Sequence, residues 1–316
     1  MSLELVSSES GLVDAIADGS VAGDEPARTK RLSRRALLLR RFLRNKTAVV
    51  GLFMYLFLVV LAVFGPRYIA KWNFTELDRE SYLQGPTWEH WLGTNQPGRD
   101  VLAMSLEGLR KSMLISLVVG VGSTTIAAIV GSFAAYFGGW FERISLWYID
   151  LLLVLPSFLV IAVFMRNVDT NLVLWLIFWL VLLGWMLSAR VVRSLTMSVR
   201  DREYVTAAKY MGVPGPTIVV RHILPNIASL LIIDATLGIG AAVLAETSLA
   251  FFGFGIRSPD VSLGTVIQEG SRMATTFPWV FVGGASFLVF MVVAINFIGD
   301  GLRDAFDPSS KSGGGA

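Results

Sequence analysis

The chain has 316 residues, of which 54% are hydrophobic and 16% are charged, and its formal net charge is +3. Soluble globular proteins are about 45–50% apolar and about 25% charged, so this composition indicates a membrane protein. The sequence contains no cysteine, which excludes disulfides, thiol catalysis and cysteine-ligated metals, and its two histidines offer little for a histidine metal centre.

The composition changes several times along the first third of the chain. Residues 1–27 are polar, acidic and rich in Gly, Ser and Ala, and we expect a disordered tail there. Residues 28–46 hold nine Lys or Arg and no acidic residue, which makes them a basic juxtamembrane segment. Residues 47–66 carry no charge and are predicted to form the first transmembrane helix. Residues 67–111 are expected to form an outer loop with an amphipathic helix.

Apolar segments long enough to cross a membrane follow one another through the chain. A helix needs about 20 apolar residues to span the hydrocarbon core. The segments are 47–66, 112–141, 144–165, 170–189, 223–256 and 273–299. One such segment could be a buried core helix of a soluble protein, but six in one chain predict an all-α membrane protein with six transmembrane helices. Pro156 is expected to kink the third of them, because its ring removes one backbone hydrogen bond.

The loops between these spans differ in basic charge. With the N-terminus inside, eighteen Lys or Arg lie on the inner side and nine on the outer side. Because basic residues are more frequent in cytoplasmic loops, this ratio supports cytoplasmic N- and C-termini. Residues 190–222 then lie in the cytoplasm, and residues 301–316 form a cytoplasmic tail.

The inner segment 200–226 combines charges, glycines and three prolines between two apolar spans. We predict a helix that starts near Arg202 and is capped by Asp201 or Ser198. Spacings of three, four and seven residues predict that one face of this helix carries Tyr204, Ala207, Ala208 and Met211.

The same segment contains two signals that end a helix. Gly212 follows the predicted face, at a position where a helix often stops with a positive φ. Pro214 and Pro216 then prevent continuation. A second short helix, 217–224, is expected to end before Pro225. The segment is thus predicted to be a helix–turn–helix.

Two interpretations of this helix–turn–helix remain open from physics alone. It could be an interfacial pair that merely connects two spans, or a docking element whose alanines let another protein approach the backbone closely. DNA binding is not indicated, because both ends are tethered to the bilayer.

These residues resemble a known family. EYVTAAKYMGV (203–213) and HILPN (222–226) resemble the EAA loop of ABC-importer permeases. Four further stretches, 90–113, 136–158, 243–256 and 296–308, resemble the C-type permease subunit of oligopeptide and dipeptide importers, so the likeness covers about residues 30–308. Asn95, where the family usually has an aspartate, and the short loop 166–169 depart from the pattern.

The resemblance implies the type I permease fold of ABC importers, with a permease core at 112–300 and a cytoplasmic coupling helix in the loop 200–226. It implies contact with an ATPase through a set of eight residues. These are Glu203, Tyr204, Ala207, Ala208, Met211, Gly212, Arg221 and Pro225. The implied partners are a second homologous permease, two ATP-binding subunits, an extracytoplasmic substrate-binding protein and the lipid bilayer, with oligopeptides or dipeptides as cargo.

The sequence lacks G-x-x-x-x-G-K-[ST], so we expect no nucleotide site and no cofactor in this chain. ATP and Mg²⁺ are expected on the partner ATPase subunits, and this chain is not expected to be an enzyme. It is expected to be a multi-pass protein of the cell membrane.

Three acidic residues lie within the apolar spans. Asp234 and Glu246 are twelve residues apart in the fifth span, about 18 Å along a helix. They could line a peptide pathway or form buried structural hydrogen bonds. They also leave an alternative function open, an ion-coupled secondary transporter or channel that uses both as its ion site. Asp150 is expected to snorkel or to pair with Arg143 or Arg190.

Overall fold

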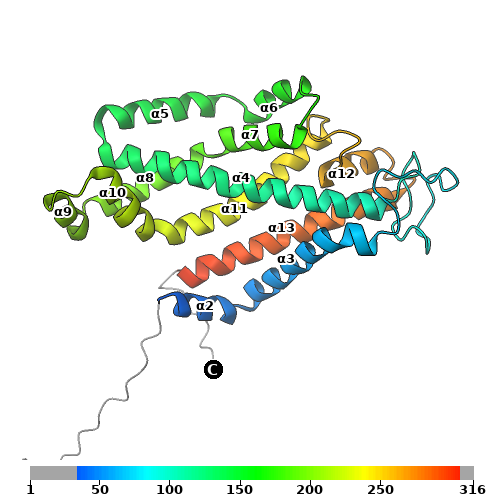
Figure 1. The fold of residues 1–316 in the computed structure, drawn as a ribbon, viewed down its shortest axis with the longest axis horizontal. Coiled ribbons are helices and arrows are strands. Elements are labelled where there is room, and N and C mark those ends of the chain that lie inside the picture. The colour runs from blue at the N-terminus through cyan, green and yellow to red at the C-terminus, as the bar shows by residue number, and fades with distance from the viewer. Residues whose placement is uncertain (1–33, 307–316) are drawn as a thin grey trace, which may run out of the picture. The chain divides into compact units, whose positions relative to one another are not determined.

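The computed structural model describes residues 34–306 (Figure 1). Within that range the chain is helical, and no strand is formed apart from an isolated bridge between Thr94 and Asp100. The chain divides into two compact units, Met1–Arg40 and Arg41–Ala316, and helix α2 (Arg34–Arg44) begins in the first. The tail predicted over 1–27 lies outside the described residues, as do residues 307–316.

Long apolar helices dominate the second unit. Four continuous helical stretches are long and apolar enough to cross a membrane, and two further pairs of helices qualify as bent spans, which gives up to six within the described residues. The continuous stretches are α3 (Lys46–Phe64) with η1 (Gly65–Ile69), α4 (Val101–Phe137), α10 to α11 (Gly215–Phe251) and α13 (Pro278–Phe306). The pairs are α5 (Gly139–Val154) with α6 (Ser157–Arg166), and α7 (Leu172–Gly184) with α8 (Met186–Arg200). The six predicted spans correspond to these elements.

Both bent pairs break at identifiable residues. Pro156 separates α5 from α6, and the two helices meet at 73°. A residue before proline is disfavoured in helical geometry, and Leu155 accordingly has an extended backbone, ψ 127°. The kink predicted at Pro156 is therefore a complete break. The α7–α8 pair bends by 41° at the buried Trp185.

Helix α4 is the centre of the second unit and packs against α3, α7, α8, α11, α12 (Leu263–Ser271) and α13. Small residues make the closest crossings possible. A Cβ on Gly120 would lie 2.7 Å from the backbone nitrogen of Ile239 in α11. Backbones can approach this closely only where no side chain intervenes.

The outer loop predicted over 67–111 differs in the structure. Between residues 70 and 100 the chain is irregular and forms no amphipathic helix, and the helical residues within 67–111 belong to η1 and to the first turns of α4. Helix α4 begins at Val101, where the Asp100 side chain accepts a hydrogen bond of 2.7 Å from the Ala103 nitrogen. Helix α4 thus begins before the apolar segment 112–141. Charged residues are tolerated in its first turns because they form ion pairs. Lys111 lies 3.7 Å from Glu107 and 2.6 Å from Asp260.

A buried histidine holds the irregular loop together. His90 is fully buried, its Nδ1 lies 2.8 Å from Asp100 Oδ2, and its Nε2 lies 3.3 Å from Asp78 Oδ2. Its ring stacks on Trp72 with centroids 5.2 Å apart. Hydrogen bonds from the Ser81 side chain, then from the backbone of Glu80 and from His90, lower the pKa of Asp78. These side-chain contacts, rather than a helix, hold the conformation of the loop.

Figure 1 shows α9 (Glu203–Tyr210) and α10 (Gly215–Ile218) at one end of the second unit, and α12 with the loop 70–100 at the other. We call these the α9 end and the α12 end. The two ends carry different candidate sites.

Candidate functional site

Helix α9 begins where the sequence predicted, but without the predicted cap. Its N-cap residue is Arg202, and no side chain caps the helix. The Asp201 carboxylate instead accepts a hydrogen bond of 3.1 Å from Arg200 Nε, and the Ser198 hydroxyl donates to the Leu195 carbonyl at 2.7 Å. Both predicted caps were wrong, because each side chain is engaged at the end of α8.

The predicted four-residue face of α9 is divided between two sides of the helix. Ala208 is only 1% exposed and packs with Val205 into a buried cluster formed with α8, α10 and the start of α11. The other three members of that face point outward and are exposed: Tyr204, Ala207 and Met211. The prediction was wrong for Ala208, because Val205 and Ala208, three residues apart, form the inward face.

The outward face of α9 is larger than predicted. Tyr210, which sequence reasoning missed, is 88% exposed, and Met211 is 76% exposed. Glu203 at the first turn is also exposed. We call Glu203, Tyr204, Ala207, Tyr210 and Met211 the α9 outer face. Three of its members, Tyr204, Tyr210 and Met211, are large exposed side chains.

Gly212 ends the helix as predicted. Its φ is +77°, and a Cβ at this position would meet nothing within 4 Å. The turn is closed by a hydrogen bond of 3.1 Å from the Val213 nitrogen to the Ala208 carbonyl. Glycine is therefore required here by backbone conformation alone.

The second predicted helix does not stop before Pro225. Helix α10, the π-helical turn η2 (Val219–Ile223) and α11 (Leu224–Phe251) follow without interruption, so Pro225 lies in the first turn of α11. The prediction was wrong because the wider π turn changes the hydrogen-bond pattern just before the proline, whose missing N–H is then tolerated. Both Pro225 and Arg221 are exposed.

Helix α9 is tied to the elements that surround it. The Asn226 side chain donates a hydrogen bond of 2.7 Å to the Tyr204 hydroxyl, which joins α9 to α11. Val205 and Ala208 of α9 also belong to a buried cluster against which Phe133 and Tyr136 of α4 pack. A displacement of α9 would therefore be transmitted to the 37-residue stretch Gly215–Phe251 and to α4.

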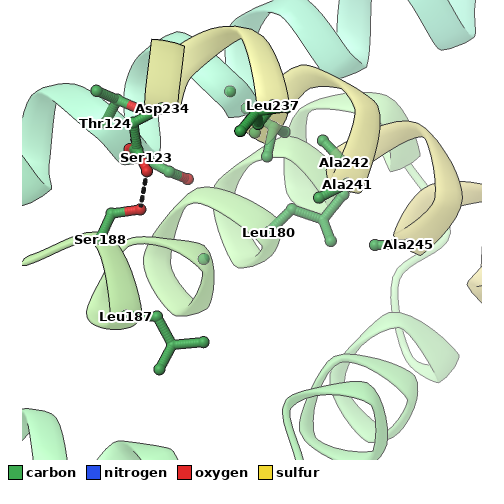
Figure 2. Close-up of a pocket in the computed structure, with 14 residues that line it drawn as sticks. Ser123, Thr124, Leu180, Leu187, Ser188, Asp234, Leu237, Ala241, Ala242 and Ala245 are labelled. Atoms are coloured by element: carbon green, nitrogen blue, oxygen red, sulfur yellow. Dashed lines mark hydrogen bonds between the residues drawn. The ribbon is translucent and has the colours of Figure 1, made fainter. Parts of the chain in front are cut away.

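A second candidate site is a cavity of about 340 Å³ among α4, α7, α8 and α11. Asp234 projects from α11, and its two carboxylate oxygens accept hydrogen bonds of 2.9 Å from Thr124 of α4 and Ser188 of α8. Figure 2 shows these polar residues together at one end of the cavity, with Ala241, Ala242 and Ala245 at the other. Thr124 and Ser188 were not identified from the sequence as partners of Asp234. The signal that could have pointed to them is that both are polar residues inside apolar segments.

Glu246 occupies a different environment. It is fully buried, and Ser112 of α4 donates a hydrogen bond of 3.0 Å to its carboxylate. The same Ser112 hydroxyl accepts a hydrogen bond of 3.2 Å from the Leu263 nitrogen at the start of α12. Glu246 therefore joins α4, α11 and α12, and it is not among the residues that line the cavity at Asp234.

The two carboxylates that the alternative function would use lie in different surroundings. Asp234 lines the cavity and Glu246 does not, and no group of three or more His, Cys, Asp or Glu in residues 34–306 could hold a metal ion. Asp150 pairs with Arg190, one of the two partners considered from the sequence.

The α12 end carries a polar hollow of about 500 Å³ that sequence reasoning missed. Its lining includes Arg99, Arg257, Arg272 and Glu269. Asn95 donates a hydrogen bond of 2.9 Å to Glu269 Oε1 and accepts one of 2.7 Å from the Arg99 nitrogen. Burial raises the pKa of Glu269, while Asn95, Arg99 and Arg272 act in the opposite direction. The departure from the family pattern at Asn95 thus has a structural role.

Comparisons with known proteins agree with this architecture. Residues 127–312 match the family model described as binding-protein-dependent transport system inner membrane component. The chain belongs to this family. Residues 33–86 match the N-terminal TM domain of oligopeptide transport permease C. The first match includes the α9 outer face and Asp234.

Two relatives match nearly the whole chain. The oligopeptide transport system permease protein OppC of Mycobacterium tuberculosis is 52% identical over 285 residues, 90% of this chain and 98% of the relative. The dipeptide transport system permease protein DppC of Alkalihalophilus pseudofirmus is 32% identical over 273 residues, 85% of this chain and 88% of the relative. The family and the type I permease fold inferred from the sequence are confirmed.

Proposed function

We propose that this chain is the permease subunit of an ATP-driven importer of oligopeptides or dipeptides in the inner membrane. The names of the two relatives support this cargo. The proposed complex contains a second homologous permease, two ATP-binding subunits and an extracytoplasmic substrate-binding protein. ATP and Mg²⁺ would be held by the ATP-binding subunits, since this sequence contains no phosphate-binding loop motif.

The proposed orientation has both termini and the α9 end in the cytoplasm. The excess of Lys and Arg in the segments that would then lie inside supports it. The α12 end, with its irregular loop 70–100 and the polar hollow at Glu269, would face the binding protein.

The proposed coupling element is the α9 outer face. The observation that carries this proposal is an exposed, largely apolar helix face on a helix that is hydrogen-bonded to α11 and packs in one cluster with side chains of α4. An ATP-binding subunit that moves α9 would move α11 and α4 with it, and so change the walls of the cavity at Asp234. Coupling requires the nucleotide states to bind the α9 outer face with different free energies, and each 1.4 kcal/mol is a tenfold difference.

A charge at the most exposed position of the α9 outer face tests this proposal. We expect Tyr210→Glu to reduce co-purification of the ATP-binding subunits at least tenfold, because a carboxylate would be desolvated in the contact. The matched control is Tyr82→Glu at the α12 end, where the side chain is 60% exposed. Unchanged co-purification with Tyr210→Glu, or equal loss with both variants, would refute α9 as the contact.

A further inference from the structure

We propose that the cavity at Asp234 binds the protonated α-amino group of the peptide in transit, with Asp234 and Ser123 as its acceptors. This inference rests on the proposed function and names the chemistry by which one site of the path recognises its cargo.

The first argument is the cost of the charge. An aspartate near the centre of a membrane helix carries a large free-energy cost of insertion, and such residues usually line substrate or ion pathways. Asp234 is half-buried, and among the described residues that line the cavity it is the charged one. The hydroxyls of Thr124 and Ser188 fix the carboxylate from two different helices without neutralising it.

A purely structural tie between helices would not need a charge. Helices α4 and α8 are joined elsewhere by a neutral hydrogen bond of 3.2 Å between Ser132 and Thr196. Helices α4 and α11 already meet at the close crossing of Gly120 with Ile239. Glu246 does join helices through a carboxylate, but it is fully buried and does not line this cavity, whereas the half-buried Asp234 does.

Acceptor capacity remains unused in the cavity. A carboxylate offers about four lone-pair sites, and Asp234 uses two of them in its hydrogen bonds with Thr124 and Ser188. The Ser123 hydroxyl also lines the cavity, and its oxygen is buried without a hydrogen-bond partner in the part of the chain that the structure describes. Figure 2 shows Ser123 beside Asp234. The buried unpaired hydroxyl and the carboxylate beside it thus leave acceptor sites that N–H groups of a ligand can fill.

An ammonium group supplies the missing donors. It carries three N–H donors and no acceptor, and charge-assisted bonds to a carboxylate are about twice as strong as neutral ones. A single carboxylate with hydroxyls is a poor site for a metal ion, which prefers several charged or carbonyl oxygens. The N-terminal ammonium is common to all unmodified peptides, so one such site serves cargo of different sequences.

The size of the cavity suits one end of a peptide. Its volume of about 340 Å³ lies at the lower limit of small-molecule pockets, roughly 300–1,000 Å³. Ala241 and Ala245 on the far side leave room for a first side chain without selecting it. The remainder of the peptide would extend out of this cavity along the path.

Binding of a matched peptide pair tests the proposal. The assembled complex of both permeases and the ATP-binding subunits, without the binding protein, is titrated with radiolabelled tetra-alanine and with its N-acetyl form. We expect the wild type to bind the free amine at least tenfold more tightly. Asp234→Asn should weaken binding of the free amine about tenfold or more and leave the acetylated peptide unchanged, so that the preference disappears.

Two controls separate this chemistry from a general structural effect. Asp150→Asn changes a carboxylate of another span that does not line the cavity, and it should retain the preference. Asp234→Glu keeps the negative charge and should retain part of the preference for the free amine. If Asp234→Asn does not assemble, the wild type still decides, because equal binding of both peptides, or binding of neither, overturns the proposal. Failure of the ATP-binding subunits to co-purify with the wild type would instead overturn the proposed function.

Discussion

The close crossing of α4 and α11 at Gly120 predicts how much stability the protein loses when the two helices are forced apart. In Gly120→Ala the new Cβ would lie 2.6 Å from Ile239 Cγ1 and 2.7 Å from the Ile239 backbone nitrogen. Ordinary contacts begin near 3.4 Å, so the two helices must separate by about 0.7 Å. The backbone nitrogen cannot rotate away as a side-chain terminus could.

Overpacking of this kind costs about 1–3 kcal/mol. Each kcal/mol lowers Tm by about 2–4 °C in chains of 150–250 residues and by less in a chain of 316 residues, so we expect a decrease of a few °C, below about 12 °C, for the purified protein in detergent. The matched control is Gly240→Ala in the same helix as Ile239, where the new Cβ would make an ordinary contact of 3.4 Å with Ile295. A Tm of Gly120→Ala equal to that of the wild type, or a larger loss in the control, would refute the packing argument.

Two further predictions concern Gly212 and Glu269. In Gly212→Ala the new Cβ meets open space, but alanine must adopt a left-handed backbone conformation, which costs about 1–2 kcal/mol. This variant should therefore lower peptide uptake per ATP hydrolysed. The control Gly139→Ala, with φ +58° and equally open space, should leave that ratio unchanged. Because the pKa of Glu269 is raised in the folded protein, its contribution to the free energy of unfolding is present at low pH and falls as the pH rises above its ordinary value of 4.5 through the folded value. In chemical denaturation, Glu269→Gln should remove this part of the decrease in the free energy of unfolding between acidic and neutral pH. An unchanged pH profile would show that Glu269 is not the group responsible.

The sequence predicted the features that depend on local chemistry. The apolar segments located the spans, because burial in lipid requires about 20 apolar residues whatever the packing. Pro156 was predicted to kink a helix that the structure breaks completely, and Gly212 was correctly identified as a stop, since a missing N–H and a positive φ are properties of single residues. The distribution of basic residues supported an orientation but does not reveal which side chains form a site.

The features that depend on packing could not be predicted. Ala207 and Ala208 are adjacent and identical in type, yet one is exposed and the other buried against α8 and α10. Pro225 suggested a helix end, but a π turn carries the chain past it. Thr124 and Ser188 are 64 residues apart, and only the packing of α4 and α8 brings both to Asp234.

The central claim, that the α9 outer face docks on an ATP-binding subunit, is tested most directly by site-specific cross-linking. The chain has no cysteine, so Tyr210→Cys introduces a unique thiol for a maleimide–benzophenone reagent. The account predicts that light cross-links this residue to an ATP-binding subunit in assembled membranes, with a yield that changes on addition of ATP, and that Tyr82→Cys gives no such product. Labelling of Tyr210→Cys by a membrane-impermeant maleimide from outside intact cells, or equal cross-linking of both variants, would contradict it.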